Sequence, residues 1–215
     1  GKTTIGRMII GLIPPTEGSV CFDGIDLGSL NGEEQRRLRR RMQVIFQDPM
    51  ASLNPRMTLG DAISHGLKIH YPEKSAEYRD ITMRIMERVG LSPPYFFFTK
   101  YPHHISGGQR QRIMVARAYM LHPRLIVADE PVSAVDASLR AMIQDIIMRL
   151  CHDERISFIY ITHDLSTAYQ ISDLMYVLFQ GTTAERGNTA KIIENPKHPY
   201  VQALIDSIPV PDPKI

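Results

Sequence analysis

The sequence has few cysteines and no long apolar run. Its two cysteines, Cys21 and Cys151, stand far apart and belong to no Cys-x-x-Cys or Cys/His cluster. This scarcity argues against a disulfide framework and a zinc site, and it fits a reducing compartment. The longest apolar runs, such as 174–179, have the length of a strand, whereas a membrane-spanning helix needs about 20 apolar residues. The sequence therefore predicts no membrane-spanning helix.

The chain also lacks a strong charge of one sign. Its 25 basic and 23 acidic side chains give a formal net charge of +2, which does not by itself indicate a polyanionic partner. One basic cluster follows Glu33 and Glu34 and consists of Arg36, Arg37, Arg39, Arg40 and Arg41. Nucleic-acid binding is one interpretation of this cluster. We favour a solvated helix face with Glu–Arg pairs four residues apart, and we predict no nucleic-acid partner.

The composition is that of a globular protein, with 43% hydrophobic and 22% charged residues in a chain of 215. Short apolar runs alternate with longer helical patterns, which predicts an α/β fold with a mainly parallel sheet. Strands are expected at 19–22, 43–46, 125–128, 157–162, 174–179 and 182–185. Helices are expected at 59–70, 76–89, 108–121, 138–150, 165–171 and 189–194, with a loop at 48–58.

The hydrophobic pattern of the sequence changes between Pro49 and Pro123, where helical patterns replace strand patterns. We therefore predict that 1–48 and 123–188 form one core and that 49–122 is a helical subdomain inserted into it. The remaining segment, 189–215, is expected to be a C-terminal extension.

The chain opens with Gly1-Lys2-Thr3-Thr4, which runs into an apolar helical pattern. These residues match the last three defined positions of the phosphate-binding pattern G-x-x-x-x-G-K-[ST]. There, backbone N–H groups at a helix N-terminus hold phosphate, the lysine reaches the β- and γ-phosphates, and the next hydroxyl binds Mg²⁺. Such a tetrapeptide also occurs in solvated turns. Because neither a Met nor a strand precedes it, we expect a sequence truncated at its N-terminus.

A second motif ends an apolar run, where Asp129 and Glu130 follow residues 125–128. The end of a parallel strand presents such carboxylates at the edge of the sheet where ligands bind in open α/β folds. Asp129 would hold Mg²⁺, directly or through water, and Glu130 could accept the proton of an attacking water. The alternative is an ordinary strand end with exposed acids.

A third motif, Ser106-Gly107-Gly108-Gln109, stands at the start of the helix expected at 108–121. It predicts a second phosphate-facing helix N-terminus, one without a lysine of its own. One nucleotide does not need two such sites from a single chain. The second site is therefore expected to serve a nucleotide held by another subunit, whereas the alternative is a capped turn.

Together these motifs resemble those of the ATP-binding subunits of ABC transporters. Residues 105–109 resemble the signature motif, with Ile105 in the usual leucine position, and Asp129-Glu130 resembles Walker B with its catalytic glutamate. Three further matches complete the set, namely the Q-loop glutamine (Gln47), the D-loop (Ser133-Ala134-Val135-Asp136) and the switch histidine (His163).

The resemblance implies a P-loop NTPase (RecA-like) core with an inserted α-helical subdomain, which binds ATP and Mg²⁺ and hydrolyses ATP. It implies that Glu130 and His163 are catalytic. The implied ATP-binding residues are Gly1, Lys2, Thr3, Thr4, Gln47, Ser106, Gly107, Gly108, Gln109 and Asp136. The implied Mg²⁺ ligands are Thr3, Gln47 and Asp129.

A narrower resemblance points to the dipeptide/oligopeptide importer subfamily. It rests on residues 46–49, 52–58, 101–103 and 195–200, the last of which read Asn-Pro-Lys-His-Pro-Tyr. His104 departs from the subfamily pattern, because an acidic residue usually stands at that position.

This resemblance implies a second ATP-binding subunit, identical or homologous, together with membrane permease subunits and, indirectly, a solute-binding protein. It implies a peripheral location on the cytoplasmic face of the inner membrane. Nickel or another small solute is an alternative cargo, since the cargo is chosen by other subunits. A soluble ABC ATPase acting on nucleic acid or ribosomes is a further alternative, although the long coiled-coil insertions or tandem cassettes typical of such proteins are missing from this sequence.

Overall fold

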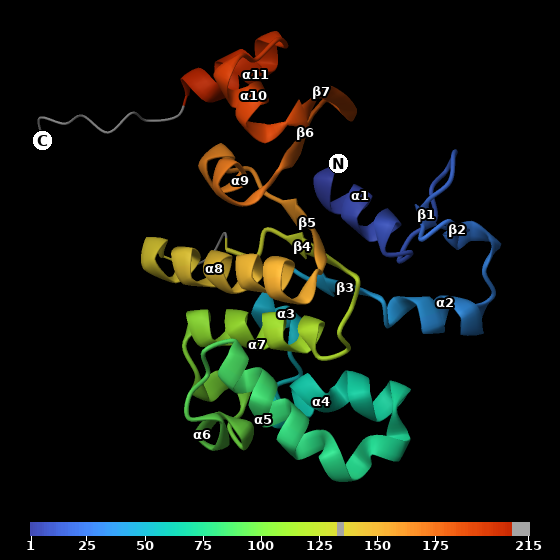
Figure 1. Cartoon of the computed structure of the whole chain (residues 1–215), viewed down its shortest axis with the longest axis vertical. Coiled ribbons are helices and arrows are strands. Elements are labelled where there is room, and N and C mark those ends of the chain that lie inside the picture. Colours follow the sequence, from blue (N-terminus) through green and yellow to red (C-terminus); the bar gives the residue numbers. More distant parts are fainter. Residues whose placement is uncertain (133–135, 208–215) are drawn as a thin grey trace, which may run out of the picture. The chain divides into compact units, whose positions relative to one another are not determined.

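The computed structural model describes residues 1–132 and 136–207 (Figure 1). The chain divides into two compact units, which are described separately. The larger unit is Ile5–Ile161, and the smaller unit combines Gly1–Thr4 with the chain from Thr162 onwards. The predicted division into core, helical subdomain and extension stays a prediction. Among the described helices, none is long and apolar enough to cross a membrane.

The larger unit contains a three-stranded parallel sheet in the order β3-β4-β5, which confirms the predicted parallel architecture. Its strands are β3 (Met42–Ile45), β4 (Leu125–Asp129) and β5 (Ser157–Ile161). The central strand β4 is buried along its whole length, as expected where both faces of a parallel sheet are covered. Because the strands are parallel, their carboxyl ends meet at one edge, where Asp129 pairs with Ile161.

Alternate side chains of β4 enter two different cores, because successive residues of a strand point to opposite faces. Ile126 and Ala128 join a core with α7 (Gly107–Tyr119) and α8 (Ala137–Glu154). On the other face, Leu125 and Val127 pack with the chain around the end of α1 (Lys2–Ile9). A Cβ at Gly6 of α1 would lie 2.8 Å from Ile161 Cδ1, so glycine lets this helix approach the sheet closely.

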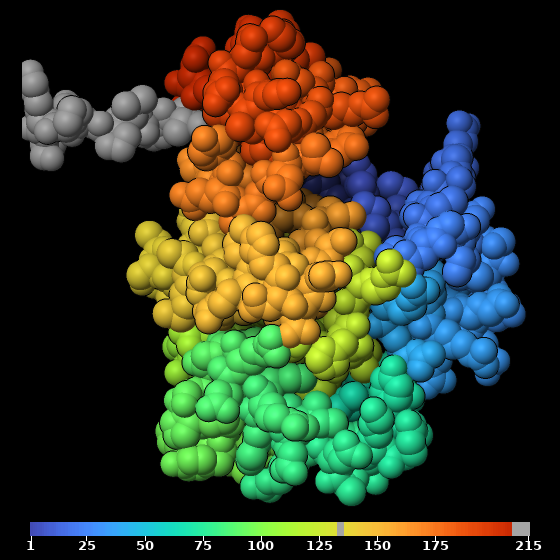
Figure 2. All heavy atoms as spheres, in the orientation of Figure 1, coloured from blue at the N-terminus to red at the C-terminus, as the bar shows by residue number. Residues whose placement is uncertain are grey.

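Residues 49–119 of the same unit are helical and share the α7–α8 core (Figure 1). Before α7 they form α3 (Pro49–Ser52), α4 (Leu59–His70), η2 (Pro72–Glu77), α5 (Tyr78–Arg88), α6 (Pro94–Phe98) and η3 (Pro102–His104). On the face seen in Figure 2 these helices, teal to green, form a continuous surface. Arg117 on α7 donates to the carbonyl oxygen of Ser52 at 2.6 Å, which ties α3 to α7. Burial lowers the pKa of Arg117 below its ordinary value.

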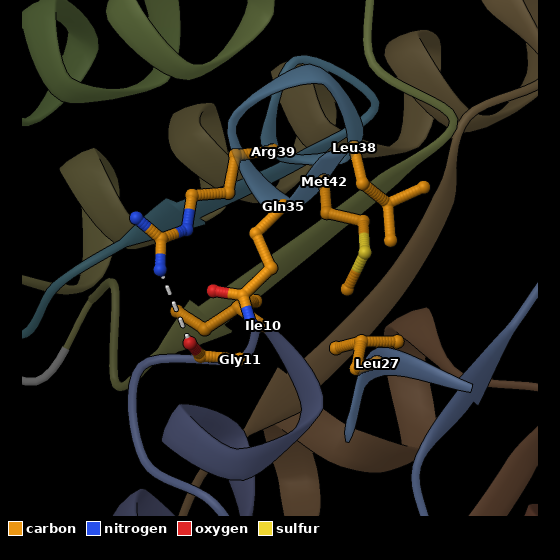
Figure 3. A pocket seen from close by; sticks show the side chains of 7 residues that line it. All are labelled: Ile10, Gly11, Leu27, Gln35, Leu38, Arg39 and Met42. Atoms are coloured by element: carbon orange, nitrogen blue, oxygen red, sulfur yellow. Dashed lines mark hydrogen bonds between the residues drawn. The ribbon is translucent and has the colours of Figure 1, made fainter. Parts of the chain in front are cut away.

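A small part of the larger unit is formed by the residues that lie between α1 and β3 in the sequence. It consists of the antiparallel pair β1 (Cys21–Phe22) and β2 (Ile25–Asp26), followed by η1 (Leu27–Ser29) and α2 (Gly32–Arg39). A cavity of about 30 Å³ lies here, where Arg39 donates to Gly11 O at 3.3 Å (Figure 3). Its lining residues are Ile10, Gly11, Leu27, Gln35, Leu38, Arg39 and Met42. A cavity of this size has room for no more than a few water molecules, so it cannot hold a nucleotide.

The smaller unit is built on the hairpin of β6 (Leu174–Phe179) and β7 (Thr182–Asn188). It also contains α9 (Leu165–Ile171), α10 (Thr189–Glu194) and α11 (Pro199–Asp206). Hydrogen bonds hold the segment that precedes α11 against β7. Both carboxylate oxygens of Glu185 accept from the backbone N–H of Lys197, and Oε2 also accepts from the N–H of His198, at 3.1–3.2 Å. The ring of Tyr200 stacks on Phe179 with 4.3 Å between centroids. The resemblance at 195–200 thus falls on a segment with a definite structural role.

The pKa of His70, at the end of α4, lies below its ordinary value of 6.5. Burial of the ring is the main cause, and the positive charges of Arg40 and Arg36 add to it. A group with a lowered folded-state pKa contributes stability that is present above its ordinary pKa and is lost as the pH falls through the folded value. We therefore expect His70→Gln to reduce the fall in melting temperature of the full-length protein between about pH 7.5 and about pH 5.

The control for this prediction is His65→Gln, which changes an exposed histidine of the same helix and should leave the fall as in the wild type. Equal pH dependence in the wild type and the His70→Gln variant would show that His70 does not contribute.

Candidate functional site

Three polar side chains gather at the carboxyl edge of the parallel sheet. Gln47 follows β3 by two residues, Asp129 ends β4, and Glu130 comes directly after it. The amide nitrogen of Gln47 donates a hydrogen bond to Glu130 Oε2 at 3.0 Å. Asp129 is only 7% exposed. The structure thus brings the carboxamide of Gln47 together with two carboxylates that stand 82 residues or more later in the sequence.

The backbone of Glu130 is in the left-handed region, with φ of 47°. A non-glycine residue in this conformation costs on the order of 1 kcal/mol, and such residues are concentrated at functional sites. Its N–H donates to Ile161 O at 2.9 Å, which holds the turn against the end of β5. The chain therefore bends sharply at Glu130 and presents its carboxylate at the sheet edge.

The helix α7 begins at Gly107 with Ser106 as its N-cap. Ser106 Oγ accepts from the N–H of Gln109 at 3.3 Å, and Gln109 Oε1 accepts in return from the N–H of Ser106 at 3.0 Å. This capping box does not use the N–H groups of Gly107, which is exposed, and Gly108, which is buried, in the first turn, where the helix dipole favours an anion. A Cβ at Gly108 would lie 2.7 Å from Leu139, so this glycine is also needed for the packing of α7 against α8.

Asp136, the last residue of the predicted D-loop, is the N-cap of α8. Its Oδ1 accepts from the N–H of Leu139 at 2.9 Å and from the hydroxyl of Ser138 at 2.7 Å. These bonds hold the pKa of Asp136 below its ordinary value. The other residues of the predicted D-loop, 133–135, lie outside the described residues, and the nucleotide-binding role of Asp136 stays a prediction.

The remaining predicted site residues belong to the smaller unit. Lys2, Thr3 and Thr4 form the first turn of α1, where Lys2 and Thr4 are exposed, as is Gly1 before them, and Thr3 is half-buried. His163 is exposed and directly precedes Asp164, the N-cap of α9. The predicted set is thus divided, with Gln47, Asp129, Glu130, Asp136 and 106–109 in the larger unit.

One buried polar residue near these groups belongs to none of the sequence motifs. Gln111 on α7 is 3% exposed, and its side-chain amide donates to the carbonyl oxygen of Pro131. The sequence did contain a signal, because Gln111 stands three residues after Gly108 and four before Val115, on the buried face of the helix. A polar side chain on such a face needs a partner, although the sequence does not say which one.

Comparison with known proteins shows which family has this arrangement. The family model described as "ABC transporter" matches residues 1–133, more than half of the chain. The chain belongs to the ABC transporter family. A second family model, for the C-terminal region of oligopeptide/dipeptide transporters, matches residues 184–215.

Among individual ABC proteins, the chain is 44% identical over its full length to the oligopeptide transport ATP-binding protein OppF of Salmonella typhimurium. It is 43% identical, again over its full length, to OppF of Escherichia coli. The chain spans 64% of the length of each of these two relatives. Among solved structures, the dimeric ATP-binding cassette MJ0796 bound to ADP and Pi is 27% identical, with a TM-score of 0.78. That match covers 88% of this chain and 81% of the cassette.

Proposed function

We propose that this chain is part of an ATP-hydrolysing subunit that drives an ABC importer for dipeptides or oligopeptides. The observation that carries the proposal is the Gln47–Glu130 hydrogen bond at the carboxyl edge of the parallel sheet, next to the buried Asp129. Ligands of open α/β folds bind at this edge. A carboxylate placed at this edge suits the role of a general base.

The side chains at this edge suit Mg²⁺. Gln47 uses its amide nitrogen toward Glu130, which leaves the amide oxygen as a ligand atom, and Asp129 supplies carboxylate oxygens. The family pattern adds the hydroxyl of Thr3. All three are the hard oxygen ligands that Mg²⁺ prefers, and the bound ion neutralises charge on the phosphate oxygens.

The protein's own side chains would supply the remaining chemistry. Glu130 accepts a proton from the attacking water, and His163 orients this water and senses the γ-phosphate. Lys2 offsets phosphate charge, while the backbone of Gly1 and the first turn of α1, including Thr4, binds phosphate oxygens. The rate enhancement would come mainly from positioning and from charge stabilisation, as is usual for phosphoryl transfer.

The start of α7 would complete the pocket of a second ATP-binding subunit. The N–H groups of the exposed Gly107 and the buried Gly108 in its first turn suit a phosphate, yet this helix carries no lysine comparable to Lys2. A head-to-tail pair, of identical or homologous subunits, would place Ser106 and Gln109 beside the nucleotide of the opposite subunit. The dimeric state of the cassette MJ0796 supports this arrangement.

The C-terminal segment supports the proposed cargo and membrane partners. Residues 184–215 match the oligopeptide/dipeptide transporter region, and both OppF relatives are oligopeptide transport proteins by name. Permease subunits, an indirect solute-binding protein and a location on the cytoplasmic face of the inner membrane belong to this proposal.

The test is ATP-dependent uptake by the full-length protein, assembled with its permease subunits in proteoliposomes. We expect Mg²⁺-dependent ATP hydrolysis and uptake of a labelled oligopeptide, and we expect chelation of Mg²⁺ by EDTA to stop both. Hydrolysis with uptake of nickel but not of peptide would contradict the cargo. An assembly without ATP hydrolysis would contradict the enzymatic role.

A further inference from the structure

The larger unit contributes two parts of the proposed catalytic site, the start of α7 and the turn at Glu130. One buried side chain connects them. Gln111 lies five residues after Ser106 and donates its hydrogen bond to Pro131, the residue after Glu130. Proline has no N–H, so its carbonyl oxygen is the only backbone group of Pro131 that can form a hydrogen bond. Gln111 therefore donates to the one backbone group through which a hydrogen bond can hold Pro131 in place.

Among the described residues, three hydrogen bonds from three different elements hold the Glu130 turn. The N–H of Glu130 donates to Ile161 at the end of β5, its carboxylate accepts from Gln47 after β3, and the carbonyl of Pro131 accepts from Gln111 on α7. The first two tie the turn to the sheet. Gln111 alone among these three ties it to the helix whose N-terminus carries the signature motif.

A second contact supports the same connection. A Cβ on Gly108 would meet the side chain of Leu139 at 2.7 Å, so the first turn of α7 packs directly on the first turn of α8. Val132, next to Pro131, is buried in the core that α7 and α8 share. The start of α7 thus touches the chain on both sides of residues 133–135, at Pro131 and at Leu139. We expect a displacement of the start of α7 to shift both Pro131 and Leu139.

We propose that Gln111 is a positioning residue that couples the Ser106 end of α7 to the carboxylate of Glu130. The inference rests on the proposed function, in which Ser106 contacts the nucleotide of the opposite subunit while Glu130 acts on the nucleotide of its own. A phosphate that engages the start of α7 then also fixes the turn that presents Glu130. Through Gln111, each chain links the occupancy of one pocket to the chemistry of the other.

The test is the variant Gln111→Met in the full-length protein within its assembled transporter. Methionine nearly matches glutamine in size but cannot donate to Pro131. We expect kcat for ATP hydrolysis to fall about tenfold, since small displacements of a catalytic group are costly. The KM for ATP should stay within about twofold of the wild type, because Gln111 is expected to act through Glu130 and not on ATP binding.

The matched control is Gln144→Met on α8. Gln144 is also buried, at 7% exposure, but its amide nitrogen has no hydrogen-bond partner among the described residues. We expect this variant to keep the wild-type kcat. Amide hydrogen exchange gives a second readout, because loss of the Gln111 bond should speed exchange of the Glu130 N–H, whereas the control should not. If Gln111→Met does not fold, Gln111→Asn, which keeps the amide but is too short to reach Pro131, replaces it.

Three results would overturn the inference. They are an unchanged kcat in Gln111→Met, an equal fall in kcat for both methionine variants, or unaltered exchange of the Glu130 N–H. A wild-type assembly that does not hydrolyse ATP would instead overturn the proposed function, while the exchange measurement would still report on the Gln111 bond.

Discussion

Glu130→Gln is expected to lower ATP turnover by about 100-fold or more, because a positioned general base contributes about that much to a rate. The glutamine keeps the size of the side chain and can still bond to Gln47, but it cannot accept the proton of water. Binding of ATP does not use this proton transfer. ATP-dependent association of the subunits should therefore persist in the variant, and hydrolysis under saturating ATP with size-exclusion chromatography would measure the two properties separately.

A suitable control is Glu87→Gln, which changes an exposed glutamate on α5 and should leave turnover as in the wild type. Near-normal steady-state hydrolysis by the Glu130→Gln variant would remove Glu130 from its proposed role. Loss of ATP-dependent association as well would show that the residue supports the structure and not only the chemistry.

Ser106→Arg is expected to abolish turnover in the assembled transporter. Ser106 is exposed at the N-terminus of α7, so an arginine there would fill the space in which the nucleotide of the opposite subunit is expected to lie. Folding should survive, because a side chain at this exposed position displaces no core residue. ATPase assays of the purified complex would measure the loss.

The matched control is Ser106→Ala, which removes the hydroxyl cap but leaves the space open. Loss of an N-cap costs about 1 kcal/mol of stability, so this variant should lose far less turnover than Ser106→Arg. Full activity in the arginine variant would argue against a pocket shared between subunits.

The sequence predicted best those elements whose caps and periodicity agree. Helices were predicted at 59–70, 165–171 and 189–194, and the structure has α4, α9 and α10 with these bounds. Each is preceded by a side chain that caps the first turn, namely Thr58, Asp164 and Asn188. Local signals suffice there because the cap, the apolar face and the end of the helix lie within one short segment.

Elements set by short turns were predicted less well. The strand expected at 19–22 is reduced to Cys21–Phe22, because only these two residues pair with β2 across the turn at Asp23 and Gly24. Residues 49–52 were expected to be a loop but form α3, since Asp48 caps them and Pro49 suits the first helical turn. Helix α8 extends to Glu154, four residues beyond the predicted end.

The motifs identified candidate site residues but not the contacts that hold them. Gln47 and Glu130 are 83 residues apart, and their hydrogen bond exists only because β3 and β4 pair in parallel. The left-handed backbone of Glu130 and the bond from Gln111 to Pro131 likewise depend on tertiary packing. No local periodicity encodes such contacts between distant segments.

The most direct test is an experimental structure of the full-length Glu130→Gln transporter with ATP and Mg²⁺ bound. The account predicts that Ser106 Oγ and the N–H of Gly108 lie within about 3 Å of the triphosphate bound to the opposite ATP-binding subunit. A structure in which the first turn of α7 faces bulk water, with that triphosphate enclosed by one subunit alone, would contradict it.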